Sequence, residues 1–263
     1  MNEEKVVFVG PSVPCEEFEK FPDLQFLSPC KQGDVYLATL NNPVAIGIID
    51  GYFEGAPSVW HKEILWALSR GISVLGASSM GALRASELDA FGMEGVGEIY
   101  KWYKTGQISD DDEVALLHGP EALKFPAISE PMVNIRATCQ LALMQEVAPK
   151  PLVDDILSVA KSTFYKTRTW HQVLTDVEHR IPDRAQLRSF TNWLEHNKKD
   201  QKHLDAVELC ERMSSLRPQD RELPKFQFEE TEFWFQNTKL WQRQKPAKPD
   251  KRDGSKEYRL FEY

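Results

Sequence analysis

Three short apolar runs near the N-terminus constrain the fold of this chain more than any other feature. They are "KVVFVG" at 5–10, "VAIGIIDG" at 44–51 and "ISVLGAS" at 72–78. None of them alternates between apolar and polar residues, as a strand with one wet face would. Continuous apolar runs of this length are typical of strands covered on both faces. The sequence therefore predicts a buried, mostly parallel sheet.

A helix is expected between the second and third runs, in "APSVWHKEILWALSRG" at 56–71. Trp60, Ile64 and Leu68 fall on one helical stripe, and Gly71 is a common stop signal. Such a strand, helix and strand almost always form a right-handed crossover between parallel strands. The front half is thus predicted to be a small open α/β domain. The segment "DVYLATL" at 34–40 fits either a further strand or a helix.

Helical periodicity dominates from about residue 97, most clearly in "SEPMVNIRATCQLALMQE" at 129–146, where Ser129 can cap a helix. The predicted class is α/β, a small open mostly parallel sheet flanked by helices, followed by a mainly helical second half. We expect three parts, which are an α/β core at 1–125, a helical region at 126–220, and a polar, basic, weakly ordered tail at 221–263. The aromatic cluster "FWF" at 233–235 can dock on the body or on a partner.

Composition limits the function classes. The 263 residues are 41% hydrophobic and carry a net charge of −8, of which residues 1–130 hold −11 and residues 131–263 hold +3. An acidic front half argues against a nucleic-acid binder and favours a protein partner steered by charge. No apolar run approaches the roughly 18 residues of a membrane span, and no export signal is visible. Four cysteines without a CxxC pair predict neither a zinc ribbon nor a disulfide framework, so we expect a cytoplasmic protein.

The third apolar run ends in a pattern that suggests a nucleophile. Ala77-Ser78-Ser79-Met80-Gly81 fits the elbow G-x-S-x-G except that alanine replaces the first glycine. A strand that turns into a helix there would expose Ser79, and the free N–H groups at Met80 and Gly81 would hold an anion or oxyanion. Asp50 falls at the end of the neighbouring predicted strand, where ligands bind in parallel sheets. In the plainer interpretation, Ser78 or Ser79 only caps the helix.

His61 is the best candidate for the general base. It lies in the first turn of a predicted helix, where the dipole disfavours the imidazolium form. A half-buried structural histidine is the alternative. Lys62 is expected either in an exposed ion pair or, if desolvated, as a base.

The run "SDDDEVALLH" at 109–118 concentrates carboxylates that can complement a helix dipole. Arg84 and Arg136 can supply the counter-cation, or can instead grip a substrate carboxylate. The spacing of the acids is not diagnostic of a metal, and the glycines of "FGMEGVGEIY" complete no dinucleotide or P-loop signature. A cation site at Asp110 to Glu113 is possible from oxygen ligands, but we assign no residue to a metal and predict no cofactor.

Several longer phrases resemble the TfuA-like proteins. They are "IIDGYFEGAPSVWHKEIL", "GASSMGALRASEL", "FGMEGVGEIYKWYKTG", "DDDEVALLH" and "EPMVNIRAT", in the family's order, over roughly residues 5–145. The resemblance implies a partner of YcaO enzymes in peptide backbone thioamidation. It implies a hydrolase that releases sulfide from the C-terminal thiocarboxylate of a small ubiquitin-like sulfur carrier, with Ser79 as nucleophile. YcaO and the carrier are the implied partners.

Two other functions remain open. A non-catalytic adaptor would bind and activate YcaO, with the acidic front half as its docking surface. A phosphate or nucleotide site is the third possibility, because a helix start holds anions without any catalysis.

Overall fold

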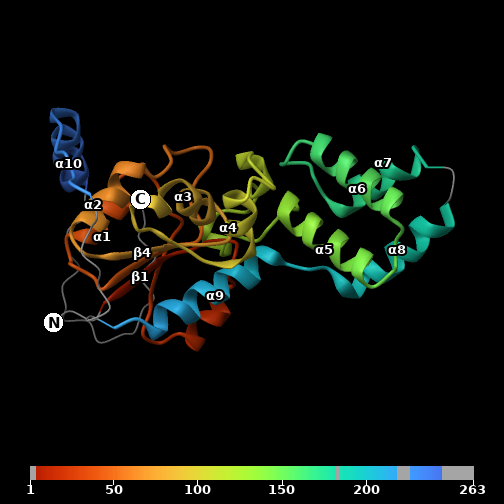
Figure 1. Cartoon of the computed structure of the whole chain (residues 1–263), viewed down its shortest axis with the longest axis horizontal. Helices are drawn as coiled ribbons and strands as arrows, with labels where there is room; N and C mark the ends of the chain where they lie inside the picture. The colour runs from red at the N-terminus through yellow and green to blue at the C-terminus, as the bar shows by residue number, and fades with distance from the viewer. Residues whose placement is uncertain (1–3, 182–183, 218–225, 245–263) are drawn as a thin grey trace.

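The computed structural model describes residues 4–181, 184–217 and 226–244. The strands are β1 (Lys5–Phe8), β2 (Gln25–Leu27), β3 (Ala45–Ile48), β4 (Ser73–Gly76) and β5 (Glu94–Gly95). The helices are α1 (Asp34–Thr39), α2 (His61–Ser69), α3 (Met80–Leu88), α4 (Gly97–Lys104), α5 (Met132–Met144), α6 (Lys150–Ser162), α7 (Trp170–Glu178), α8 (Arg184–Asn197), α9 (Gln201–Ser215) and α10 (Glu232–Gln244). Figure 1 shows the sheet beside a separate lobe of helices, with α9 running from that lobe back along the sheet.

The strands form one parallel sheet in the order β2-β1-β3-β4-β5. The three predicted apolar runs supply its central strands β1, β3 and β4, which are buried along almost their whole length. The segment that fitted either a strand or a helix forms α1. The predicted α/β class with a mainly helical second half is confirmed.

Alternate residues of the central strands meet different layers. Val6 and Phe8 belong to the core cluster that contains residues of α1, α2 and α3, whereas Val7 and Val9 belong to the cluster that contains residues of α9. Gly47 of β3 has no room for a side chain, because a Cβ there would lie 2.4 Å from the sulfur of Met213 in α9. The second face of the sheet is therefore covered by a helix that follows the entire helical lobe in sequence.

The helical lobe has its own apolar core, formed by α5 to α8 around Ile135, Ile156, Val173 and Phe190. Whether the predicted ranges 1–125, 126–220 and 221–263 fold as separate units stays a prediction. The structure adds that α9, from the second range, packs on the sheet of the first.

Helix α10 packs its aromatic side chains on α1 and α2. Trp234 and Trp241 are buried, at ring-centroid distances of 5.5 and 5.7 Å from Tyr36. Of the predicted "FWF" cluster, Trp234 thus docks on the body, whereas Phe233 and Phe235 are exposed. Residues 218–225 and 245–263 of the predicted tail lie outside the described residues. Within the described part of the chain, no helix is both long and apolar enough to cross a bilayer.

The turn from β4 into α3 needs a glycine at its inner side. A Cβ on Gly81 would lie 1.7 Å from the carbonyl oxygen of Ile48 in β3, and a Cβ on Gly76 would lie 2.1 Å from the carbonyl oxygen of Gly81. Helix α3 therefore starts in direct contact with the sheet.

Gly81→Ala is expected to lower the free energy of unfolding by about 3 kcal/mol or more, because neither backbone segment can move away without disturbing the sheet. Urea unfolding measures the change. Gly106→Ala is the control, since Gly106 has a positive φ of 73° but open space around its Cα. That variant is expected to lose only about 1 to 2 kcal/mol for its backbone conformation, and equal losses in both variants would contradict the contact argument.

Candidate functional site

The strand order creates a crevice at one end of the sheet. After β1 the chain crosses to β2 on one side, and after β3 it crosses to β4 on the other. In open parallel sheets, ligands bind at such a switch point, beyond the carboxyl ends of the two strands. Here the residues that follow β1 and β3 include Ser12 and Asp50.

Asp50 organises this end of the sheet. Its carboxylate is 2% exposed and accepts three hydrogen bonds, from the backbone N–H groups of Gly10 (2.9 Å) and Ser12 (3.0 Å) and from the hydroxyl of Ser12 (2.7 Å). A buried carboxylate needs such donors to remain charged. Asp50 therefore fixes the loop after β1 and the direction of the Ser12 side chain. Its predicted role in binding a substrate stays a prediction.

The predicted turn between β4 and α3 is present, and its strained residue is Ser78. Ser78 has a φ of +65°, and Ser79 N–H donates to Ala77 O at 2.7 Å, which closes a γ-turn around Ser78. The hydroxyl of Ser78 donates to the hydroxyl of Ser12 at 3.1 Å. Ser79 is the N-cap residue of α3, without a side-chain cap bond. Both elbow serines are buried, at 0% and 2% exposed.

A buried lysine completes the network. Lys202, in the first turn of α9, is 3% exposed, and its Nζ donates to Val114 O at 3.0 Å and lies 3.7 Å from Asp50 Oδ1. Burial lowers the pKa of the Lys202 ammonium, and the negative charge of Asp50 opposes that shift. Ser78, Ser12, Asp50 and Lys202 thus form one connected polar chain.

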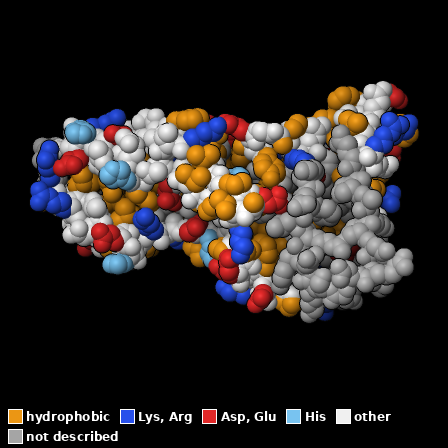
Figure 2. Space-filling view, turned by 180° about the vertical axis from the view of Figure 1, so that it is seen from behind, with side chains coloured by type: hydrophobic (Ala, Val, Ile, Leu, Met, Phe, Trp, Pro, Cys, Tyr) orange, Lys and Arg blue, Asp and Glu red, His pale blue; other side chains and the backbone are white. Residues whose placement is uncertain are grey.

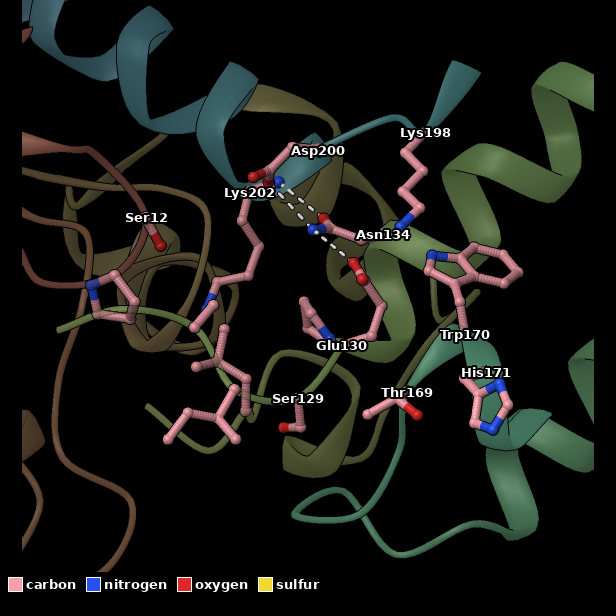
Figure 3. A pocket seen from close by; sticks show the side chains of 15 residues that line it. Ser12, Ser129, Glu130, Asn134, Thr169, Trp170, His171, Lys198, Asp200 and Lys202 are labelled. Atoms are coloured by element: carbon pink, nitrogen blue, oxygen red, sulfur yellow. Dashed lines mark hydrogen bonds between the residues drawn. The ribbon is translucent and has the colours of Figure 1, made fainter. Parts of the chain in front are cut away.

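A cavity of about 360 Å³ opens in front of this chain, between the sheet and the helical lobe (Figure 3). Ser12 and Lys202 line it from the sheet side, and Glu130, Asn134 and the first residues of α7 line it from the lobe. Its size is in the range of small-molecule sites. Ser78 lies behind Ser12 and does not line the cavity.

Asn134 braces the opposite wall. Its amide nitrogen donates to Asp200 Oδ1 at 3.0 Å and to Glu130 Oε1 at 3.4 Å, and its amide oxygen accepts the N–H of Lys202 at 3.1 Å. The dashed lines of Figure 3 mark these bonds. Asn134 therefore connects the start of α5, which the sequence "EPMVNIRAT" forms, to the start of α9, which carries Lys202.

The predicted base is located elsewhere. His61 is the first residue of α2, as expected, but its Nε2 lies 2.7 Å from Glu87 Oε2, and its side chain is 48% exposed. Lys62 donates to Thr231 Oγ1 at 3.1 Å. Among the described residues, neither side chain forms a hydrogen bond with Ser78 or Ser79, and their catalytic and binding roles stay predictions.

Two other predicted substrate-binding side chains line a second cavity of about 360 Å³. Met80 and Arg84 lie there, beside Phe53, Glu87 and Asp111. Arg84 Nη1 pairs with Glu87 Oε2 at 2.8 Å. Gly81, also predicted in the site, contacts the sheet, as described above. The elbow residues therefore face different surroundings at the start of α3. Ser78 bonds to Ser12 behind the first cavity, whereas Met80 lines the second cavity.

The acidic run is held by cations from the helical lobe. The carboxylates of Asp110, Asp112 and Glu113 gather around the ammonium of Lys161, which raises the pKa of that lysine although desolvation opposes the shift. Arg136 binds Glu113 through two hydrogen bonds of 2.8 Å. Of the two predicted roles of Arg136, the structure shows the counter-cation, whereas contact with a substrate stays a prediction.

Arg168, which is fully buried, binds Asp112 Oδ2 at 2.8 Å and immediately precedes Thr169, the N-cap residue of α7. These ion pairs attach the lobe to the sheet part and fix the side of the cavity that α7 forms. Ion pairs in such partly buried places add little net stability. We therefore expect these pairs mainly to fix the position of the lobe.

Sequence reasoning missed Ser12 and Lys202. Ser12 follows a predicted strand, so the rule about strand ends could have identified it. Nothing in the sequence marks Lys202, which reaches the site only because α9 returns to the sheet.

The comparison with known families decides the relationship. Residues 50–169 match the family model described as TfuA-like protein. This stretch belongs to the TfuA-like family. No curated protein matches the chain. The predicted resemblance is confirmed, and the TfuA-like stretch contains Asp50, Ser78 and Asn134, whereas Ser12 precedes it and Lys202 follows it.

The two buried charges are expected to differ in their contributions to stability. Asp50→Asn should lower the free energy of unfolding by about 3 kcal/mol, because it leaves the Lys202 ammonium buried with one carbonyl partner. Lys202→Met should cost about 1 kcal/mol or less, because Asp50 keeps three donors. Urea unfolding at neutral pH measures both variants, and a greater loss in Lys202→Met would contradict this assignment.

Proposed function

We propose that the protein is a sulfur-delivery hydrolase that releases sulfide from a thiocarboxylated ubiquitin-like carrier for YcaO-dependent peptide backbone thioamidation. The reaction takes place in the cavity at the switch point. The partners are a YcaO protein and the carrier, and the acidic front half gives a charge by which a protein partner is steered. No nucleic acid is part of this proposal.

One observation carries it, which is the hydroxyl of Ser12 at the wall of the cavity, bonded to Asp50 at 2.7 Å and to Ser78 at 3.1 Å. A serine becomes a nucleophile when an adjacent group accepts its proton and fixes its direction. Asp50 provides both functions. Because Ser12 alone of these three side chains lines the cavity, we assign the attack to Ser12 rather than to an elbow serine.

The first step forms an ester. The oxygen of Ser12 adds to the thiocarboxyl carbon, the bond from carbon to sulfur breaks, and hydrosulfide leaves. The serine proton passes through Asp50 to the expelled sulfur, so that atoms and charge balance. Hydrosulfide is a good leaving group, and the step therefore needs no strong general acid. Water then hydrolyses the ester and restores Ser12.

The surroundings suit an anionic substrate. Lys202 brings positive charge to a site where little water screens it, and charge interactions are stronger there than in bulk solvent. Lys198 and the N-terminal end of α7 are also at the cavity. A helix start favours negative charge, so a carrier tail that ends in a thiocarboxylate is complementary to this wall.

Ser12→Ala is expected to slow sulfide release from a thiocarboxylated carrier by about 10³-fold or more, because the attacking oxygen is gone. Ser78→Ala should slow sulfide release about tenfold, because one hydrogen bond to the nucleophile is lost. Methylene-blue detection of sulfide measures the rate, with Ser189→Ala on α8 as the control. Full turnover in Ser12→Ala would overturn the assignment, and loss of turnover in Ser79→Ala alone would support the elbow prediction instead.

The adaptor function makes a different prediction in the same system. An adaptor stimulates thioamide formation equally with free sulfide and with loaded carrier, and Ser12→Ala leaves both unchanged. The hydrolase stimulates only the reaction supplied with loaded carrier, and Ser12→Ala removes that stimulation. Mass spectrometry of the thioamidated peptide separates the two.

A further inference from the structure

Glu130 is a cavity side chain whose carboxylate has little hydrogen bonding. Its carboxylate lines the cavity and receives one long hydrogen bond, 3.4 Å from Asn134 Nδ2. Among the described residues it forms no ion pair. Asp50 accepts three hydrogen bonds, whereas the Glu130 carboxylate accepts only this long one from the part of the chain that the structure describes.

The position of Glu130 is well defined by its neighbours. Its backbone N–H donates to Arg168 O at 2.7 Å, and the buried guanidinium of Arg168 is fixed by Asp112. Pro131 and α5 follow directly. The carboxylate is therefore held at the cavity wall by rigid elements, which is the arrangement that catalytic side chains need.

The titratable groups that share the cavity with Glu130 are those of His171, Lys198, Asp200 and Lys202. Burial raises the pKa of the Glu130 carboxyl, with Asp200 acting in the same direction and Asn134 and Lys198 opposing it. A carboxylate of raised pKa accepts protons more readily near neutral pH than an ordinary surface carboxylate.

We propose that Glu130 is the general base that activates water for hydrolysis of the ester on Ser12. Ser12 and Glu130 line the same cavity from opposite parts of the protein (Figure 3), so an ester on Ser12 and a water at Glu130 would both face this cavity. This inference rests on the proposed function for the identity of the acyl group. It assigns the second step to a residue that has no part in the first.

The second step balances without a further reactant. Glu130 takes one proton from water while the water oxygen adds to the ester carbon. The bond from that carbon to the Ser12 oxygen then breaks, and Glu130 returns the proton to Ser12. The product is the carboxylate of the carrier, with one proton released to solvent.

Glu130→Gln tests the assignment, because the amide keeps the shape but cannot accept the proton. With thiocarboxylated carrier, the variant should release a burst of sulfide equal to one turnover. The steady rate that follows should be about 100-fold below that of the unaltered protein. Intact mass and peptide mapping should find the carrier as an ester on Ser12. Glu195→Gln, an exposed acid on α8, is the control and should behave as the unaltered protein.

p-Nitrophenyl acetate provides a second readout that needs no carrier. It acylates reactive serines directly, and Glu130→Gln should accumulate the acetyl ester on Ser12 while the unaltered protein does not. Activity with this ester but none with the loaded carrier would reject the sulfur function and keep the role of Glu130.

Three results would overturn the inference. The first is a steady turnover in Glu130→Gln equal to that of the unaltered protein. The second is loss of both the burst and the turnover in this variant while it still unfolds at the same urea concentration as the unaltered protein. The third is that neither substrate acylates Ser12. Glu130→Asp serves as the rescue variant, since it restores a carboxylate and should recover part of the steady rate without changing the burst.

Discussion

The buried carboxylate of Asp50 is the constraint on which the site depends. It lies at the end of β3 and is 2% exposed, so its charge is stable only with donors around it. The loop after β1 supplies three of them, and the first turn of α9 supplies the ammonium of Lys202. Because the loop must bend toward Asp50 to make these bonds, the hydroxyl of Ser12 is held at the mouth of the switch point. One side chain thus joins a strand, a loop and a distant helix.

The return of α9 gives the cavity its two walls. After the acidic run at Asp110, Asp112 and Glu113, called the acidic turn here, the chain forms the helical lobe and returns as α9, which covers the second face of the sheet (Figure 1). Lys161 and Arg168 attach the lobe to the acidic turn, and Asn134 attaches it to the start of α9. These contacts join the wall with Ser12 to the wall with Glu130, and those of Asn134 lie in the cavity wall itself. The lobe completes the site as well as extending the protein.

The sequence was sufficient for the three central strands and for the family resemblance, but not for the edge strands β2 and β5 or for the site. The central strands were predictable because continuous apolar runs have few other uses, and the turn at Ser78 because small residues must stand where α3 contacts β3. The contact of Ser12 with Asp50 was not predictable, since it depends on which strands are neighbours. His61 was correctly expected at a helix start, yet its ring faces Glu87, and only the tertiary packing of α2 on α3 decides that. Lys202 required the path of the whole lobe.

The strained serine and the serine that lines the cavity are different residues, although both are buried, and this separation has a physical basis. Ser78 has a positive φ because β4 must turn sharply into α3 above the glycines that contact the sheet. That geometry points its hydroxyl at Ser12, so the elbow supports a neighbouring hydroxyl instead of presenting its own. Strain at a turn can serve an active site by fixing a hydrogen-bond donor as well as by exposing a nucleophile. Ser78, Asp50 and Lys202 come from three separate segments, and the bonds to Ser78 and Asp50 orient Ser12 without a ligand. In the proposed hydrolysis, preorganisation of this kind would lower the cost of reaching the transition state.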